Sequence, residues 1–350
     1  MLASENSKNL IPIHIVTGFL GSGKTTLLNQ LLQQSEMQRT IVIVNEFGEI
    51  SVDHLLIETT TEDMMILEGG CVCCAVRTDL LNTLEELFYK RTQQEIIEFE
   101  RVVIETTGLA DPAPILRTLI DDSFVAKHYR LDIIVTTVDA VHIIQQLVEY
   151  DESVKQVALA NHLVLTKIDL VDNLEVLTTR LQQINPTAEL HKVNLHEQCL
   201  NANTLFNTNN YDEHTRQIDI NRWLQAKSYT DQPHNYNTYI KTFCIEYHEP
   251  LHWLTLEHWI QQLTRLRGKD LLRVKGIAYT YETDLPVIIQ GVQHIFQSPT
   301  TLKAWPDDKR RSQIVFITRN IEKQLVEQVL QALIKSKNQA DICNAALLLL

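Results

Sequence analysis

No stretch of this 350-residue chain holds about eighteen consecutive apolar residues, so the sequence predicts no membrane-spanning helix. An excess of basic residues is also lacking, because 31 lysines and arginines stand against 44 aspartates and glutamates, a net charge of −13. That charge argues against a nucleic-acid partner. The opening residues MLASENSKNL have no apolar signal-peptide core, so we expect a cytoplasmic protein whose six cysteines stay reduced.

The stretch Gly18 to Thr26, GFLGSGKTT, carries the pattern G-x-x-x-x-G-K-[ST] of a phosphate-binding loop, or P-loop. An apolar run at 11–17 precedes it and an apolar-periodic segment follows, which is the strand and helix context that the motif requires. In such a loop Lys24 reaches the β- and γ-phosphates, and the Thr25 hydroxyl ligates Mg²⁺. The candidate nucleotide-binding residues here are Gly18, Gly21, Ser22, Gly23, Lys24, Thr25 and Thr26.

Continuous apolar runs alternate with helical patterns over residues 11–200. Runs of this kind suit strands buried on both faces of a parallel sheet, and they lie at 11–17, 41–44, 102–104, 133–138 and 163–165. Helical patterns lie at 80–88, from Pro112 with Asp111 as its N-cap, at 139–150 and at 173–184. The alternation predicts an α/β domain with a mainly parallel sheet over 11–200, after an N-terminal extension at 1–10.

The composition changes near residue 201. Asparagine, glutamine, threonine and aspartate dominate 201–237, and we predict a linker or long connection there. Strand patterns then lie at 239–247, 271–281, 287–296 and 313–318, and helical patterns at 256–266 and 321–333. This order predicts a smaller α+β domain over 238–345, with helices on one face of a mostly antiparallel sheet. At this length two domains are expected.

An acidic residue ends the buried run 102–104. Glu105 is followed three residues later by Gly108, which is the placement of a Walker B carboxylate and of a backbone N–H that senses the γ-phosphate. We therefore expect Glu105 to hold Mg²⁺, directly or through water. The alternative is a charged residue where a strand meets solvent. Segments 45–49 and 109–112 lie where loops that respond to the γ-phosphate are expected. No glutamine placed to orient the attacking water is evident, so we expect slow hydrolysis.

The sequence Thr166-Lys167-Ile168-Asp169 follows the run 163–165. A carboxylate at Asp169 can accept hydrogen bonds from both N1–H and the 2-amino group of guanine, which adenine does not offer in that arrangement. The stem of Lys167 can lie along the base plane. The motif therefore favours GTP over ATP, although Thr166 replaces the more usual asparagine, and a capped strand end is the alternative.

Three of the six cysteines fall within four residues, at Cys71, Cys73 and Cys74, after two glycines. Closely spaced thiolates suit Zn²⁺, Cu(I) or Co²⁺. The fourth position is open to a carboxylate, a water or a ligand from a partner, and Glu49 is a candidate carboxylate. The alternative is a set of small buried hydrophobic side chains.

The remaining cysteines and the histidines give weaker signals. Cys199, Cys244 and Cys343 are scattered, and we interpret them as packing residues. His14 and His162 lie in or beside apolar runs, which indicates core positions.

Five motifs, in the order GFLGSGKTT, NEFGE, GGCVCC, ETTGLADP and TKID, resemble those of the CobW-like P-loop GTPases. These are metallochaperones, relatives of GTPases that assist nickel and cobalamin enzymes. The later LLRVKGIAY and GVQHIF are similar to the C-terminal domain of that family. The resemblance implies a GTPase that binds metal through Cys71, Cys73 and Cys74 and hands it to a client. The chain departs from it in lacking a histidine-rich tract and in carrying Val44 where some members have a glutamate.

Together these features lead us to expect a GTP-dependent metal chaperone, with zinc as the expected metal and cobalt as its alternative. Lys24, Glu105 and Gly108 are the candidate catalytic residues, with GTP, GDP and Mg²⁺ as ligands. A client metalloprotein is the expected partner, and a homodimer is left open. Three alternatives remain, namely a GTPase regulator with structural or redox cysteines, a cobalt or iron insertion factor for cobalamin synthesis or nitrile hydratase, and a metal buffer without turnover.

Overall fold

The computed structural model describes residues 10–45, 65–69, 76–197, 199–206, 240–292, 295–296, 299–307 and 309–335. Contacts divide the chain into two compact units, which we describe separately. One is built from Asn6–Arg180 and Ala188–Asn209, and the other mainly from Asn210–Leu350, with Leu181–Thr187. No described helix is both long and apolar enough to cross a membrane.

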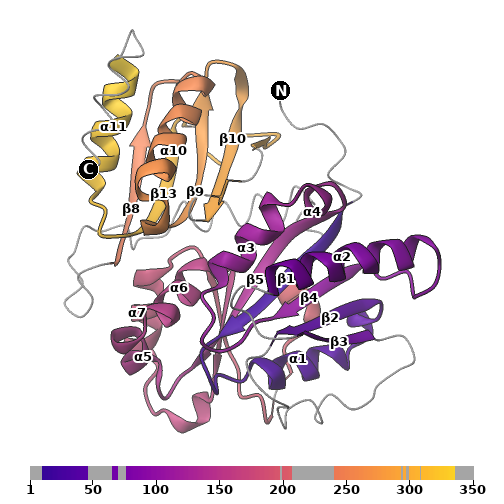
Figure 1. The fold of residues 1–350 in the computed structure, drawn as a ribbon. Coiled ribbons are helices and arrows are strands. Elements are labelled where there is room, and N and C mark those ends of the chain that lie inside the picture. Colours follow the sequence, from indigo (N-terminus) through magenta and orange to yellow (C-terminus); the bar gives the residue numbers. More distant parts are fainter. Residues whose placement is uncertain are drawn as a thin grey trace. The chain divides into compact units, whose positions relative to one another are not determined.

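The first unit contains a seven-stranded sheet in the order β3-β2-β4-β1-β5-β6-β7 (Figure 1). Every pairing in it is parallel. Its strands are β1 (Ile11–Gly18), β2 (Thr40–Asn45), β3 (Met65–Gly69), β4 (Arg101–Glu105), β5 (Tyr129–Asp139), β6 (His162–Thr166) and β7 (Glu189–Lys192). The strand order reverses at β1, and ligands of open parallel sheets bind outside the carboxyl end of the strand at such a point.

Helices cover both faces of this sheet, with α1 on one side and α2, α3 and α4 on the other (Figure 1). They are α1 (Lys24–Leu32), α2 (Val76–Thr92), α3 (Pro112–Asp121), α4 (Ser123–His128), α5 (Ile143–Glu149), α6 (Asp151–Leu159), α7 (Glu175–Ile184) and α8 (Ala202–Phe206). Single 3₁₀ turns lie at Ser35–Met37 and Ile168–Leu170. The predicted α/β class with a parallel sheet is confirmed.

Element boundaries differ from the predictions where packing outweighs local pattern. The helical pattern at 80–88 is part of a longer helix, because α2 already begins at Val76. The prediction at Asp111 is confirmed, since its side chain accepts a hydrogen bond from Ala113 N at 3.0 Å and Pro112 opens α3. Strands β3 and β7 are short, edge strands whose alternation is too brief to stand out in the sequence.

Part of the segment predicted as a linker is folded. Ala202, Leu205 and Phe206 of α8 are fully buried in the core that α1 shares with the sheet. The sequence did not reveal this helix, because α8 has only five residues and lies in a stretch of polar composition. Three of the five residues carry its apolar surface. The rest of the predicted linker lies outside the described residues.

The second unit is an antiparallel sheet in the order β11-β10-β9-β13-β8, with β12 beside β10. Its strands are β8 (Ile240–Tyr247), β9 (Leu271–Thr280), β10 (Thr283–Val292), β11 (Ile295–Phe296), β12 (Thr300–Thr301) and β13 (Ser312–Arg319). Its helices are α10 (Trp253–Arg267), a 3₁₀ turn at Gly268–Asp270 and α11 (Lys323–Lys335). These are the elements that the predicted α+β order requires, so that prediction is confirmed.

Alternation along these strands separates two layers of side chains. Phe243, Phe316 and their neighbours on one face pack with α10 and α11 in the larger core. The opposite face carries Cys244, Val315 and the strand residues that pack with Leu302. Both helices therefore lie on the same face, as expected for this class.

Among the described residues of the second unit, Trp259 is the largest fully buried side chain, and its indole N–H donates to Val326 O at 3.1 Å. We expect Trp259→Ala to lower the free energy of unfolding by about 3–5 kcal/mol, because it leaves a large cavity and removes the indole hydrogen bond. Leu254→Ala on the same helix is the matched control, since Leu254 is 65% exposed, and should change stability by less than about 0.5 kcal/mol. Urea unfolding of the full chain measures both, and equal effects would contradict this core assignment.

Candidate functional site

The chain leaves β1 through a loop that only glycine can follow at several points. Gly18, Gly21 and Gly23 have φ angles of 143°, 70° and 87°, in the region that other residues rarely adopt. At Gly18 space also matters, since a Cβ would lie 2.3 Å from Thr137 Oγ1 and 2.4 Å from Thr137 O. The loop can therefore pass directly over the end of β5 only with glycine at this position.

Buried hydroxyl groups join the P-loop to the ends of the neighbouring strands. Ser22 Oγ lies 2.6 Å from Thr137 Oγ1 of β5, and Thr166 Oγ1 of β6 donates to Ser22 O at 2.9 Å. On the other side, Thr106 Oγ1 donates to Thr17 Oγ1 at 2.8 Å. All of these side chains are buried, so their hydrogen bonds to the sheet are shielded from competition by water.

Lys24 opens α1 and folds back over the loop. Its ammonium donates to Gly18 O at 3.0 Å and to Phe19 O at 3.2 Å, and the residue is only 9% exposed. Gly23 precedes it as the N-cap in a left-handed conformation. The lysine charge is thereby kept beside the helix N-terminus, where the helix dipole also favours an anion.

Thr25 and Glu105 meet although eighty residues separate them. Thr25 Oγ1 donates to Glu105 Oε1 at 2.7 Å, and Glu105 is 4% exposed at the end of β4. A hydroxyl that gives its hydrogen to a carboxylate turns its lone pairs elsewhere, so it can also ligate a cation. The two oxygens together form a donor set that suits Mg²⁺.

The segment after β4 rests on the P-loop. A Cβ on Gly108 would lie 2.6 Å from Leu20 N, so the two backbones are in close contact. From the other side, the buried Gln156 of α6 donates to Gly108 O at 3.2 Å and Ala110 O at 3.1 Å. Lys155 adds an ion pair of 2.6 Å with Asp111. Sequence reasoning missed Gln156 and Lys155, because an isolated polar residue on a helix carries no signal.

The segment Thr166 to Asp169 forms the end of β6 and the turn after it. Thr166, at the position where asparagine is more usual, is 1% exposed. Its hydroxyl donates to Ser22 O and Val138 O. Lys167 has a φ of 55°, and its ammonium donates to Asp139 Oδ2 at 2.6 Å. Asp169 is exposed. The same is true of Thr26 and Gly21 on the P-loop, which leaves these three positions open to a ligand.

Asp139 is a member of this site that sequence reasoning missed. Burial raises the pKa of its carboxyl, but hydrogen bonds from Lys167, His142 and the Val141 N–H outweigh burial, so the net pKa lies below its ordinary value. The signal was present, since Asp139 ends the apolar run 133–138 just as Glu105 ends its own. As a buried anion, Asp139 holds the stem of Lys167 in place.

The predicted metal ligands Glu49, Cys71, Cys73 and Cys74 lie outside the described residues. The strands that lead to them are described, and they are neighbours. Asn45 of β2 pairs with Gly69 of β3, and Val44 pairs with Glu105 of β4. The start of NEFGE and the start of GGCVCC therefore leave the sheet at the same ends of their strands as Glu105, one and two strands away from it.

The scattered cysteines and two of the histidines were all predicted to be packing residues, and the structure places them in different environments. Cys244 is buried, and burial raises the pKa of its thiol to about 12, so the packing role is confirmed there. Cys199 is exposed, so that prediction is wrong for it. His14 is fully buried, and burial lowers its pKa well below the usual range, whereas His162 lies beside edge strand β7. Cys343 lies outside the described residues.

A P-loop at the reversal point of a parallel sheet, with a lysine, a threonine and a strand-end carboxylate around it, defines the class of P-loop nucleotide-binding proteins. The family model of the CobW/HypB/UreG nucleotide-binding domain matches residues 12–192. The model of the cobalamin synthesis protein cobW C-terminal domain matches residues 240–334. The chain therefore belongs to the CobW/HypB/UreG family, and it also carries the C-terminal domain of the cobW type.

Two relatives and one solved structure show how far this likeness extends. The zinc chaperone YjiA of Escherichia coli (strain K12) is 32% identical over 311 residues, which span 88% of this chain and 94% of that protein. The zinc-regulated GTPase metalloprotein activator 1 of Dictyostelium discoideum is 29% identical over 317 residues, spanning 78% of this chain and 64% of that protein. The crystal structure of Zn(II)-bound YjiA GTPase from E. coli is similar with a TM-score of 0.67 and 28% identity, covering 91% of this chain and 97% of that one.

Asp139→Asn should lower the free energy of unfolding by about 1–2 kcal/mol near neutral pH. This loss is small for a buried charged group, because its partner Lys167 is 37% exposed and solvent screens the pair. Since the folded-state pKa of Asp139 is lowered, this stabilisation is present above the unfolded value of about 3.9 and is lost as pH falls through the folded value. Urea unfolding at several pH values checks this, with exposed Asp169→Asn as the control. A gap between wild type and Asp139→Asn that stays constant below about pH 4 would contradict the assignment.

Proposed function

We propose that this protein is a GTP-hydrolysing metal chaperone that binds a transition metal, zinc first, through Cys71, Cys73 and Cys74, and delivers it to a client protein. The observation that carries the proposal is the adjacency of β2, β3 and β4, because it brings the starts of two loops beside Glu105 at one sheet edge. The names of the relatives, a zinc chaperone and a zinc-regulated GTPase metalloprotein activator, support the metal and the nucleotide.

The P-loop suits the triphosphate of a nucleotide. Glycines with positive φ turn backbone N–H groups toward one concave surface, and α1 adds its positive end. Lys24 now bonds two loop carbonyls, and in the proposal its ammonium exchanges them for the β- and γ-phosphate oxygens. Ser22, whose hydroxyl holds Thr137, keeps the loop in shape while this exchange occurs.

Thr25 and Glu105 are the residues that would hold Mg²⁺. When bound, the ion supplies neutralisation of the charge that develops on the phosphate oxygens. The hydrogen bond between the two residues places both oxygens together before any ligand arrives, so little reorganisation is needed.

Asp169 and Lys167 are the residues proposed to select guanine. Asp169 is exposed at the turn after β6, where its carboxylate can accept two guanine N–H groups. Asp139 anchors the Lys167 ammonium, which leaves the lysine stem to cover the base plane. Thr166, in place of asparagine, ties this turn to Ser22 and so couples the base site to the phosphate site.

Hydrolysis depends on the segment that begins at Gly108. Its backbone N–H is proposed to meet the γ-phosphate, and its contact with Leu20 gives it a direct connection to the P-loop. Gln156 holds the same segment from behind. With no glutamine assigned to orient the attacking water, slow turnover is part of the proposal.

The metal would sit on the cysteine segment that follows Gly69, with Glu49 as a candidate for its fourth ligand. Three thiolates and an exchangeable fourth position suit a site that must release its ion. Because β2 lies between β4 and β3 and pairs with both, a change at the γ-phosphate next to Glu105 can alter the walls of this site. That is the physical basis of nucleotide-dependent delivery.

Asp169→Asn should weaken GTP binding by roughly 10–100-fold and leave ATP binding unchanged, because the variant loses a charge-assisted pair of hydrogen bonds that only guanine forms. Competition between the two nucleotides measures the change. Asp172→Asn, three residues further on and also exposed, is the matched control and should keep the wild-type preference. An unchanged preference in Asp169→Asn would remove the guanine assignment.

The central experiment measures zinc affinity by chelator competition with GDP and with a non-hydrolysable GTP analogue. Coupling between two sites is reciprocal and amounts to about 1–3 kcal/mol, so the affinities should differ by roughly 5–150-fold. The same factor must appear in nucleotide affinity with and without zinc. Cys73→Ser with Cys74→Ser should abolish tight zinc binding at the cysteine segment and spare GTP binding.

Equal zinc affinities in the two nucleotide states would defeat the chaperone mechanism even if both ligands bind. That outcome would favour a regulator with structural cysteines. Absence of phosphate release alongside tight zinc binding would instead favour a metal buffer.

A further inference from the structure

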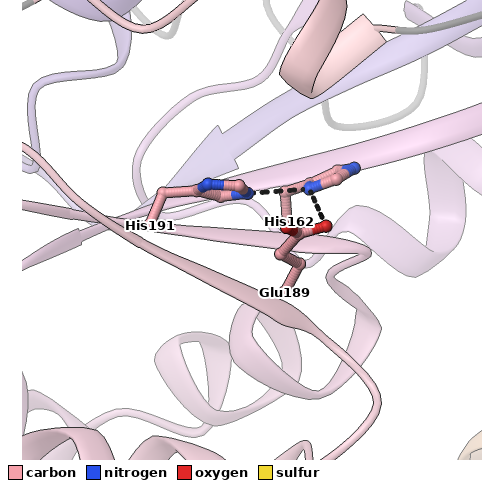
Figure 2. A group of neighbouring side chains, drawn as sticks. All are labelled: His162, Glu189 and His191. Carbon is pink, nitrogen blue, oxygen red and sulfur yellow. Dashed lines mark hydrogen bonds and ion pairs between the residues drawn. The ribbon is translucent and has the colours of Figure 1, made fainter. Parts of the chain in front are cut away.

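A group of three potential metal ligands lies at the other end of β6 from the nucleotide site. His162 begins β6, Glu189 begins β7, and His191 lies two residues further along β7 (Figure 2). His162 Nδ1 is 3.0 Å from His191 Nε2 and 3.9 Å from Glu189 Oε2. One ligand atom from each residue falls within 4.8 Å of the other two.

The strand register explains why these side chains converge. His162 is paired with Glu189, and Val164 is paired with His191, so all four side chains project from the same face of the sheet. His191 is thus the diagonal neighbour of His162, within reach for a long side chain. Because the ligands stand on paired strands rather than on a loop, their positions are fixed by backbone hydrogen bonds, including Glu189 N to Asn161 O at 2.9 Å.

The distances nearly match those of a bound ion. Tetrahedral ligands with bonds of about 2.0–2.2 Å lie about 3.3–3.6 Å from one another. The observed separations of 3.0 Å and 3.9 Å fall on either side of that value, so small side-chain rotations suffice. We propose that His162, Glu189 and His191 form a second binding site for a divalent transition-metal ion of the zinc class, with nitrogen and oxygen ligands only.

Charge and access also suit such an ion. Two neutral imidazoles and one carboxylate give a site of charge −1, in a chain whose net charge is −13, so a dication is attracted and partly neutralised. The side chains of His162 and Glu189 are 12% and 37% exposed, which leaves an entry path beside Glu189. Three protein ligands leave a fourth position for water, as in exchangeable zinc sites.

This cluster is separate from the proposed cysteine site. β3 and β7 are the two edges of the seven-stranded sheet, six strand spacings or about 29 Å apart. Cys74 is five residues beyond Gly69, a reach of at most about 18 Å. The cysteines of one chain therefore cannot complete the site at His162, and the inference does not depend on the proposed function.

The test uses the full chain with Cys71, Cys73 and Cys74 all changed to serine, titrated with Co²⁺ alone and then with Zn²⁺ against a chelator. We expect about one Co²⁺ per chain, with visible absorption and without sulfur-to-cobalt charge transfer. Adding His191→Gln should weaken binding by roughly 100-fold, and Glu189→Gln by roughly 10-fold. Zn²⁺ should raise the melting temperature of the serine variant and not that of its His191→Gln derivative.

His252→Gln is the matched control, because His252 lies 3.5 Å from Glu282 as a histidine–glutamate pair that no second imidazole joins among the described residues. It should bind Co²⁺ as the serine variant does. Nucleotide binding and the metal-free melting temperature show that each variant is folded. Absence of Co²⁺ binding in the serine variant, or binding that His191→Gln leaves unchanged in a folded protein, would overturn the proposal.

Discussion

The contact between Gly18 and Thr137 determines where the P-loop leaves the sheet. With a Cβ at Gly18 the loop could not pass over β5, and Ser22 could not reach the Thr137 hydroxyl 2.6 Å away. The hydroxyl groups of Thr106 and Thr166 extend the same attachment to β4 and β6. The residues proposed to bind phosphate, cation and base come from four strands and thus share one frame, so a shift at Thr137 would disturb all of them together.

Strand order, rather than sequence distance, decides which chemical groups can act together. β4 lies between β1 and β2, so Glu105 is adjacent both to the P-loop threonine eighty residues before it and to the strand that leads into NEFGE. A different order of the same strands would keep every motif and lose the proposed connection between nucleotide and metal.

The sequence was informative where one local pattern has one physical solution. The P-loop, the N-cap at Asp111 and the buried strands of the sheet centre needed no knowledge of the partner elements. It was uninformative where the role of a residue depends on a distant neighbour. Asp139 anchors Lys167, Gln156 supports the Gly108 segment, and His162 meets His191 across two strands, and none of these pairings follows from spacing along the chain. Short α8 was hidden for the same reason, since its burial comes from the sheet and α1.

The central position of β1 also sets a time at which the protein can first work during its synthesis. Ile11 at the start of β1 pairs with Tyr129 of β5, and Ile13 pairs with Val102 of β4. At about 5–20 residues per second a ribosome needs roughly 6–24 seconds to make the intervening stretch to β5. For that interval the P-loop motif exists as a sequence without its frame, and the nascent chain presents an unpaired apolar strand. The frame that the proposed nucleotide site needs is therefore complete only once β5 has been made.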